Sequence, residues 1–219
     1  MILTYTRLLS NLESDEGTIL FEDIDSILQV KTDEKWVMQV NPNWQMLLVD
    51  HAHCERKAAD FAINLIKSYT EYEILQAPLS KLVREEMRHF ELCLKYLKMY
   101  AIPFKPIQPC GYAKALHRII GHERKQKLMD MLIVAAFIEA RSCERFGLVA
   151  RALSQPQLIK FYQTLYQAEL RHFQNYLALA FQIYSHSQVN KRIIDIGQAE
   201  AEFVQSSEAV FRFHSAIPI

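Results

Sequence analysis

The sequence contains nearly the same five-residue phrase twice, and each copy lies within an apolar stripe that repeats with the period of a helix. The phrases are EMRHF at residues 86–90 and ELRHF at residues 169–173. Residues three apart share one face of an α-helix, so the glutamate and the histidine of each copy can reach one point. The repeat therefore predicts two long helices that face each other and bring two carboxylates and two imidazoles together.

The hydrophobic residues recur with a helical period along almost the whole chain, and only five glycines interrupt the pattern. A short helix is predicted at about 33–40. It would be capped by Thr32 and ended by Asn41-Pro42, because proline disfavours helix in the residue before it. Long helices are predicted at about 44–69, from 75 to before Pro103, and at about 132–153, 158–183 and 190–213.

A crossover is expected between the second and third long helices. It comprises a proline-containing segment at 103–109 and a short basic helix near 111–124. No alternating strand pattern competes with the helical one. The predicted fold class is therefore all-α: a four-helix bundle with extra N- and C-terminal helices.

Composition is consistent with one domain. Half of the 219 residues are hydrophobic, so we expect a single domain over residues 1–219 with the bundle core at about 43–185. Lys and Arg number 25, as do Asp and Glu, so any nucleic-acid surface must be a local patch. The four cysteines form no C-x-x-C pair, which favours reduced core residues. Without a signal segment or a long uncharged run, the chain is expected to be soluble and cytoplasmic, with no membrane span.

Charged residues within the apolar stripes indicate a metal site, because an unpaired buried carboxylate is costly. The candidate ligands are Glu55, Glu86, His89, Glu139, Glu169 and His172. Two ferrous ions would cancel the charge of four carboxylates, and mixed carboxylate and imidazole ligands suit iron or manganese better than structural zinc. We expect Glu86 and Glu169 to bridge the two ions. Glu55 and Glu139 are then the terminal carboxylates.

The ligand on the third long helix has two candidates, because the CER sequence at 143–145 repeats the one at 54–56 and so nominates Glu144. The two Glu-x-x-His pairs are 83 positions apart, Glu55 and Glu139 are 84 apart, and Glu55 and Glu144 are 89 apart. A duplicated helix pair and the helical phase both favour Glu139. His51 is an alternative ligand, and Asp50 could orient a ligand histidine, but a structural or orienting role is expected for both.

Four segments resemble one known family. They are LLVDHAHCERKAA at 47–59, REEMRHFE at 84–91, FIEARSCERF at 137–146 and ELRHF at 169–173. They look like the tRNA 2-methylthio-N6-isopentenyladenosine hydroxylase family, and the likeness covers roughly residues 36–183. The resemblance implies a ferritin-like nonheme diiron monooxygenase that hydroxylates the isopentenyl side chain of the modified adenosine at tRNA position 37.

The resemblance also implies partners. Dioxygen would be the co-substrate, and an external donor such as a ferredoxin with its reductase would supply electrons, since the chain has no flavin, haem or iron–sulfur motif. The crossover is rich in basic residues, and Arg118, Arg124 and Lys125 are the expected tRNA contacts. The competing interpretations are an iron-oxidising or iron-storing ferritin relative and another diiron oxygenase, such as a quinone hydroxylase.

Overall fold

The structure is a computed structural model that describes residues 24–219. A 3-10 helix (Ile24–Ser26) and the short helix α2 (Glu34–Met38) come first. The other helices are α3 (Trp44–Ser68), α4 (Glu73–Met99), α5 (Tyr112–His117), α6 (Arg124–Ala152), α7 (Pro156–Ile183) and α8 (His186–Gln205). Two short strands, β1 (Ser207–Glu208) and β2 (Ile217–Pro218), pair in parallel near the C-terminus.

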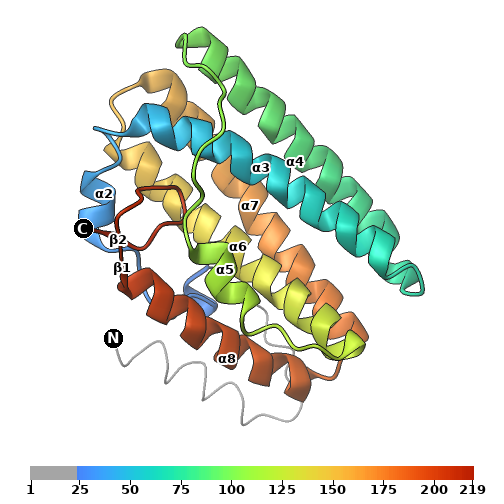
Figure 1. The fold of residues 1–219 in the computed structure, drawn as a ribbon. Helices are drawn as coiled ribbons and strands as arrows, with labels where there is room; N and C mark the ends of the chain where they lie inside the picture. The colour runs from blue at the N-terminus through green and yellow to red at the C-terminus, as the bar shows by residue number, and fades with distance from the viewer. Residues whose placement is uncertain (1–23) are drawn as a thin grey trace.

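The four long helices form two hairpins, α3 with α4 and α6 with α7, which meet most closely through α4 and α7 (Figure 1). A crossover containing α5 joins the hairpins, and α8 packs against both α5 and α6. One long crossover is the topology of ferritin-like bundles. The predicted all-α bundle with flanking helices is confirmed. The single domain over residues 1–219 stays a prediction, because residues 1–23 lie outside the described part.

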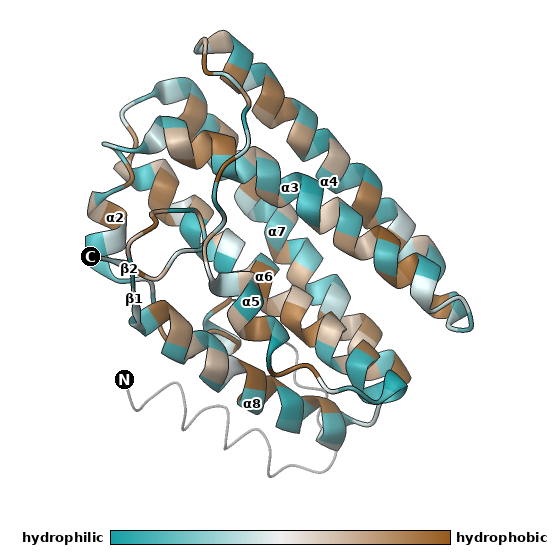
Figure 2. Cartoon of the chain, in the orientation of Figure 1, coloured by the Kyte–Doolittle hydropathy of each residue, from teal (hydrophilic) through white to brown (hydrophobic). Residues whose placement is uncertain are grey.

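Apolar faces explain this packing. Along α3, α4 and α8, hydrophilic and hydrophobic residues occupy different faces (Figure 2). Helix α6 is buried on most sides, because α7 packs along one face and α8, α2 and the 3-10 helix cover others. A buried ion pair joins the two helices: Arg141 Nε donates to Glu200 Oε1 at 2.8 Å, and the Tyr112 hydroxyl donates to the same oxygen at 2.9 Å. Among the described residues, no helix is long and apolar enough to cross a bilayer.

Several predicted helix boundaries are wrong. The cap of α2 is Asp33, whose side chain accepts the Lys35 amide, whereas Thr32 is bound to a glutamate of α6. The basic helix stops at His117, and α6 begins at Arg124 with Glu123 as its cap. The last helix starts at His186 and ends at Gln205.

The residues that follow α8 turn back instead of continuing the helix. Glu208 accepts hydrogen bonds from two backbone amides. The Gly111 amide belongs to the crossover, and the Ala216 amide belongs to the returning C-terminal segment. These contacts replace the helical ones that the periodicity predicted, and they carry the C-terminal segment (residues 206–219) toward the centre of the bundle.

Candidate metal centre

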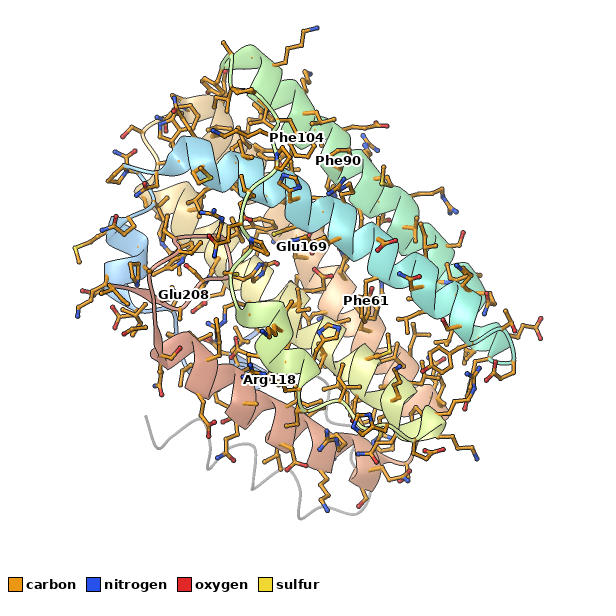
Figure 3. All side chains as sticks on the ribbon, in the orientation of Figure 1. Phe61, Phe90, Phe104, Arg118, Glu169 and Glu208 are labelled. Carbon is orange, nitrogen blue, oxygen red and sulfur yellow. The ribbon has the colours of Figure 1, made fainter. Side chains whose placement is uncertain are left out.

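Six side chains from the four long helices meet inside the bundle. They are Glu55 of α3, Glu86 and His89 of α4, Glu139 of α6, and Glu169 and His172 of α7, and all are buried. Figure 3 labels Glu169 at the middle of the bundle. The structure thus brings together every residue that the sequence nominated as a ligand.

The six residues fall into two overlapping groups. Within each group, one ligand atom per residue lies within 4.8 Å of the others. The first group contains Glu55, Glu86, His89 and Glu169, and the second contains Glu86, Glu139, Glu169 and His172. Glu86 and Glu169 belong to both groups, which is the arrangement expected of bridging carboxylates.

Both imidazoles turn their Nδ1 atoms toward the carboxylates. His89 Nδ1 lies 3.5 Å from Glu55 Oε2 and 3.6 Å from Glu169 Oε1. His172 Nδ1 lies 2.8 Å from Glu86 Oε1 and 3.2 Å from Glu169 Oε2. The nitrogen atoms therefore face the same interior space as the oxygen atoms, where they could share a cation.

The pKa values of the cluster residues are shifted by burial and by the neighbouring carboxylates. Burial raises the pKa of Glu86, and the neighbouring Glu55 carboxylate adds to the effect. Burial, followed by Glu169 and Glu86, raises the pKa of Glu139 well above its usual range. Burial alone would lower the pKa of His89, but the Glu55 and Glu86 carboxylates raise it to about 10. Without a cation the cluster must hold protons, and metal binding would release them.

The donor atoms fit a pair of metal ions. Glu169 Oε1 and His89 Nδ1 are buried and make no hydrogen bond with any described residue. Leaving such an atom unsatisfied costs about 1–3 kcal/mol. Two sets of mixed oxygen and imidazole donors that share two carboxylates suit iron or manganese. The residues present therefore fit a two-metal centre.

Two further residues hold candidate ligands in place. Glu85 Oε2 lies 2.9 Å from His172 Nε2, the ring nitrogen that faces away from the cluster. His51 Nε2 contacts Glu55 Oε1, and burial lowers the pKa of His51 to about 3, which keeps its ring neutral. A partner on the far side of a ligand fixes its orientation and tautomer.

Sequence reasoning missed Glu85, because its partner lies on another helix and no spacing within α4 signals the contact. The sequence also allowed Asp50 to orient a ligand histidine, and the structure shows a different partner. The Asp50 carboxylate accepts the Phe213 amide at 2.7 Å instead. His51 belongs to neither group of ligand atoms, so the orienting role fits it better than the ligand role.

Glu144 lies outside the cluster. Its carboxylate accepts the Thr32 hydroxyl and amide at 2.6 and 2.9 Å and pairs with Arg141. These contacts hold the pKa of Glu144 below its usual range in spite of its burial. The geometry therefore places Glu139, and not Glu144, among the candidate ligands.

The basic residues of the crossover are exposed, and one of them is already paired. Arg124 binds Glu71 at 2.7 Å and donates to the Ser68 carbonyl at 2.6 Å. Within residues 24–219, Arg118 and Lys125 form no ion pair. Figure 3 labels Arg118 on the outer surface near the end of α5.

A bundle with one long crossover and a buried carboxylate and histidine cluster on its long helices defines a ferritin-like protein of the dimetal class. The sequence matches the family described as tRNA-(MS[2]IO[6]A)-hydroxylase (MiaE) over residues 19–215. The chain belongs to this family, which confirms the resemblance seen in the sequence.

Named relatives agree with this assignment. The chain is 38% identical to the tRNA 2-(methylsulfanyl)-N(6)-isopentenyladenosine(37) hydroxylase of Pseudomonas putida, with 91% of this chain and 97% of the relative covered. It is 31% identical to the enzyme of that name from Salmonella typhimurium, with 88% and 89% covered. A solved structure described as Protein 43 with aldehyde deformylating oxygenase activity from Synechococcus is 36% identical and superposes with a TM-score of 0.84. That match covers 87% of this chain and 96% of the solved one.

Proposed function

We propose that this chain hydroxylates the isopentenyl side chain of 2-methylthio-N6-isopentenyladenosine at position 37 of tRNA, with two iron ions as its resident metal. The observation that carries the proposal is the cluster of six buried ligand residues in a chain of the tRNA hydroxylase family. Glu86 and Glu169 would be shared by both ions. Glu55 and His89 would complete one ion's ligands, and Glu139 and His172 the other's.

The bound irons would supply the two-electron chemistry that activates dioxygen. The overall reaction consumes one dioxygen, two electrons and two protons. It converts one C–H bond of the substrate to C–OH and releases one water. An external donor, such as a ferredoxin with its reductase, would provide the electrons, because the sequence carries no flavin, haem or iron–sulfur motif.

The protein itself contributes positioning and water exclusion. Glu85 and His51 fix the orientation of His172 and Glu55. Apolar side chains next to the cluster, among them Ile138 and Phe146, exclude water from the reacting region and suit an aliphatic substrate group.

Docking of tRNA would use three exposed basic residues, Arg118 of the crossover and Arg124 and Lys125 in the first turn of α6, which can contact phosphates beside the modified base. Since Arg124 is already bound to Glu71, Arg118 and Lys125 are expected to contribute more. This substrate would place the enzyme in the cytoplasm.

The direct biochemical test uses protein reconstituted with iron, a chemical reductant and tRNA carrying the modified nucleoside. With ¹⁸O₂, nucleoside mass spectrometry should show one ¹⁸O atom incorporated into the modified adenosine. The same protein is also incubated with an aldehyde, because the Synechococcus structure is described as having aldehyde deformylating oxygenase activity. Turnover of the aldehyde without hydroxylation of tRNA would overturn the proposal.

A further inference from the structure

A small cavity lies directly over the ligand cluster: Glu55, Glu86, Glu139 and Glu169 line it, and the C-terminal segment forms one of its walls. Its volume is about 30 Å³. Residues of α3 and α6 line two sides, among them Ala58 and Ile138, and Phe213 and His214 close a third. All the other lining residues belong to long helices, so these two are the part of the wall that is not helical.

The cavity is too small for the proposed substrate. A volume of about 30 Å³ has room for only about two water molecules. Four of the candidate ligands line it, so bound metal ions would take up part of this room. An isopentenyl group has five carbon atoms and needs several times that space. One wall must therefore move before the group can reach the cluster, and displacing a long bundle helix would disrupt the core.

Hydrogen bonds and ring contacts hold the C-terminal segment against the bundle, and the Phe213 ring packs against Trp36, Phe146 and Tyr162. The Phe213 amide donates to Asp50, and its carbonyl accepts from Arg145. The Phe213 ring stacks on His51 with centroids 5.4 Å apart. His214 Nε2 lies 3.0 Å from the Ser142 hydroxyl.

The same segment is tied to the crossover. Glu208 accepts the Gly111 amide at 2.8 Å, and Arg212 Nε donates to the Gln108 carbonyl at 2.7 Å. Figure 1 shows the crossover and the C-terminal segment side by side in front of α6. A ligand that moves the crossover would therefore pull on Phe213 and His214.

We infer that the isopentenyl group enters between α3 and α6 and occupies this cavity, and that the C-terminal segment is the wall that opens for it. The inference rests on the proposed function. Phe213 and His214 then limit the length of the side chain that fits. Docking of tRNA on the crossover favours the open position, through the ties at Gln108 and Gly111.

The test compares Phe213→Ala with Phe211→Ala, a matched change in the same segment. Phe211 packs on Trp36 and does not line the cavity. Iron-loaded proteins are assayed with anticodon stem–loops that carry either the five-carbon isopentenyl group or the ten-carbon geranyl group. Phe213→Ala should raise the ratio of kcat/KM for geranyl over isopentenyl by about tenfold. Phe211→Ala should leave the ratio unchanged, and both variants should keep the iron content of the parent.

If Phe213→Ala does not fold, Phe213→Leu provides the same comparison with a smaller expected change. An unchanged ratio in a folded, iron-loaded variant overturns the inference while the parent's activity still supports the proposed function. A parent that hydroxylates neither stem–loop overturns the proposed function and this inference with it.

Movement of the wall is tested by hydrogen–deuterium exchange in iron-loaded protein without dioxygen. An isopentenyl stem–loop should speed exchange of the Phe213 amide, because the hydrogen bond to Asp50 is broken in the complex. The same stem–loop with unmodified adenosine docks on the crossover but places no group in the cavity, so it should speed this exchange less. Equal exchange in the two complexes would overturn the opening of the segment.

Discussion

At the residue scale, the helix face on which a glutamate lies distinguishes the candidate metal ligands from other glutamates of the same helix. Glu144 repeats the CER context of Glu55, yet Glu139 faces the cluster and Glu144 faces Thr32 and Arg141. Helical phase and repeat spacing were sufficient to choose between them. Spacing within a helix gave no information on Glu85, whose role depends on how α4 and α7 are packed.

The two glutamates should fail in different ways. Glu139→Ala should lose bound iron and hydroxylation, because it removes a ligand atom that no neighbour replaces. Glu144→Ala should keep iron but lower the free energy of unfolding by about 3 kcal/mol, since it leaves Arg141 with one carboxylate partner fewer. Metal analysis and urea unfolding distinguish the outcomes, and iron loss confined to Glu144→Ala would reverse the assignment.

Glu85 should matter for metal affinity although it is not expected to touch a metal ion. Glu85→Ala removes the partner of His172 Nε2, so iron affinity should fall about 10- to 100-fold. Glu91→Ala, an exposed change on the same helix, is the control and should bind iron as the parent does. Equal affinities measured by competition with a chelator would show that Glu85 does not orient the histidine.

At the element scale, the periodicity predicted the long helices well and the connections poorly. The stripes of α3, α4 and α7 are long and one-sided, so their hydrophobic residues mark the buried face directly. The turn after α8 depends on the contact of Glu208 with Gly111, which joins segments distant in sequence, and on its contact with Ala216 within the C-terminal segment. Such contacts leave no periodic trace, which explains why the last helix was predicted to be too long.

The end of α4 offers a test of backbone strain. Ala101 has φ of 53°, in the left-handed region that glycine adopts more readily, and it terminates the helix just before Pro103. Ala101→Gly should therefore raise the free energy of unfolding by about 1 kcal/mol. Ala178→Gly, at an exposed position within α7, should lower it by about 1 kcal/mol. Urea unfolding of both variants checks the signs, and destabilisation by Ala101→Gly would contradict the strained conformation.

At the scale of the whole molecule, the arrangement combines a rigid bundle that holds the cluster with a surface layer of crossover, α8 and C-terminal segment. The sequence predicted the bundle and the six side chains that meet inside it, because both follow from one-sided helices. The surface layer could not be predicted, because its contacts depend on tertiary placement. The cavity wall that is proposed to open, at Phe213 and His214, lies within that layer.

The proposed tRNA surface should be visible in the salt dependence of binding. Replacing Arg118, Arg124 and Lys125 with Ala should weaken tRNA binding and flatten the plot of log Kd against log salt. Each lost phosphate contact should change the slope by about one. Because Arg124 is bound to Glu71, we expect a change of about two for the triple variant. A control triple on the exposed side of α4, Lys81, Arg84 and Arg88 to Ala, should leave the slope unchanged, and the opposite ranking would move the docking surface to α4.

The most direct test of the central claim is nucleoside mass spectrometry of tRNA from cells in which the gene for this chain is deleted. The account predicts that 2-methylthio-N6-isopentenyladenosine accumulates and that its hydroxylated form disappears. Expression of the parent chain should restore the hydroxylated nucleoside, and expression of Glu139→Ala at an equal level should not. Persistence of the hydroxylated nucleoside in the deletion strain, or its full restoration by Glu139→Ala, would contradict the claim.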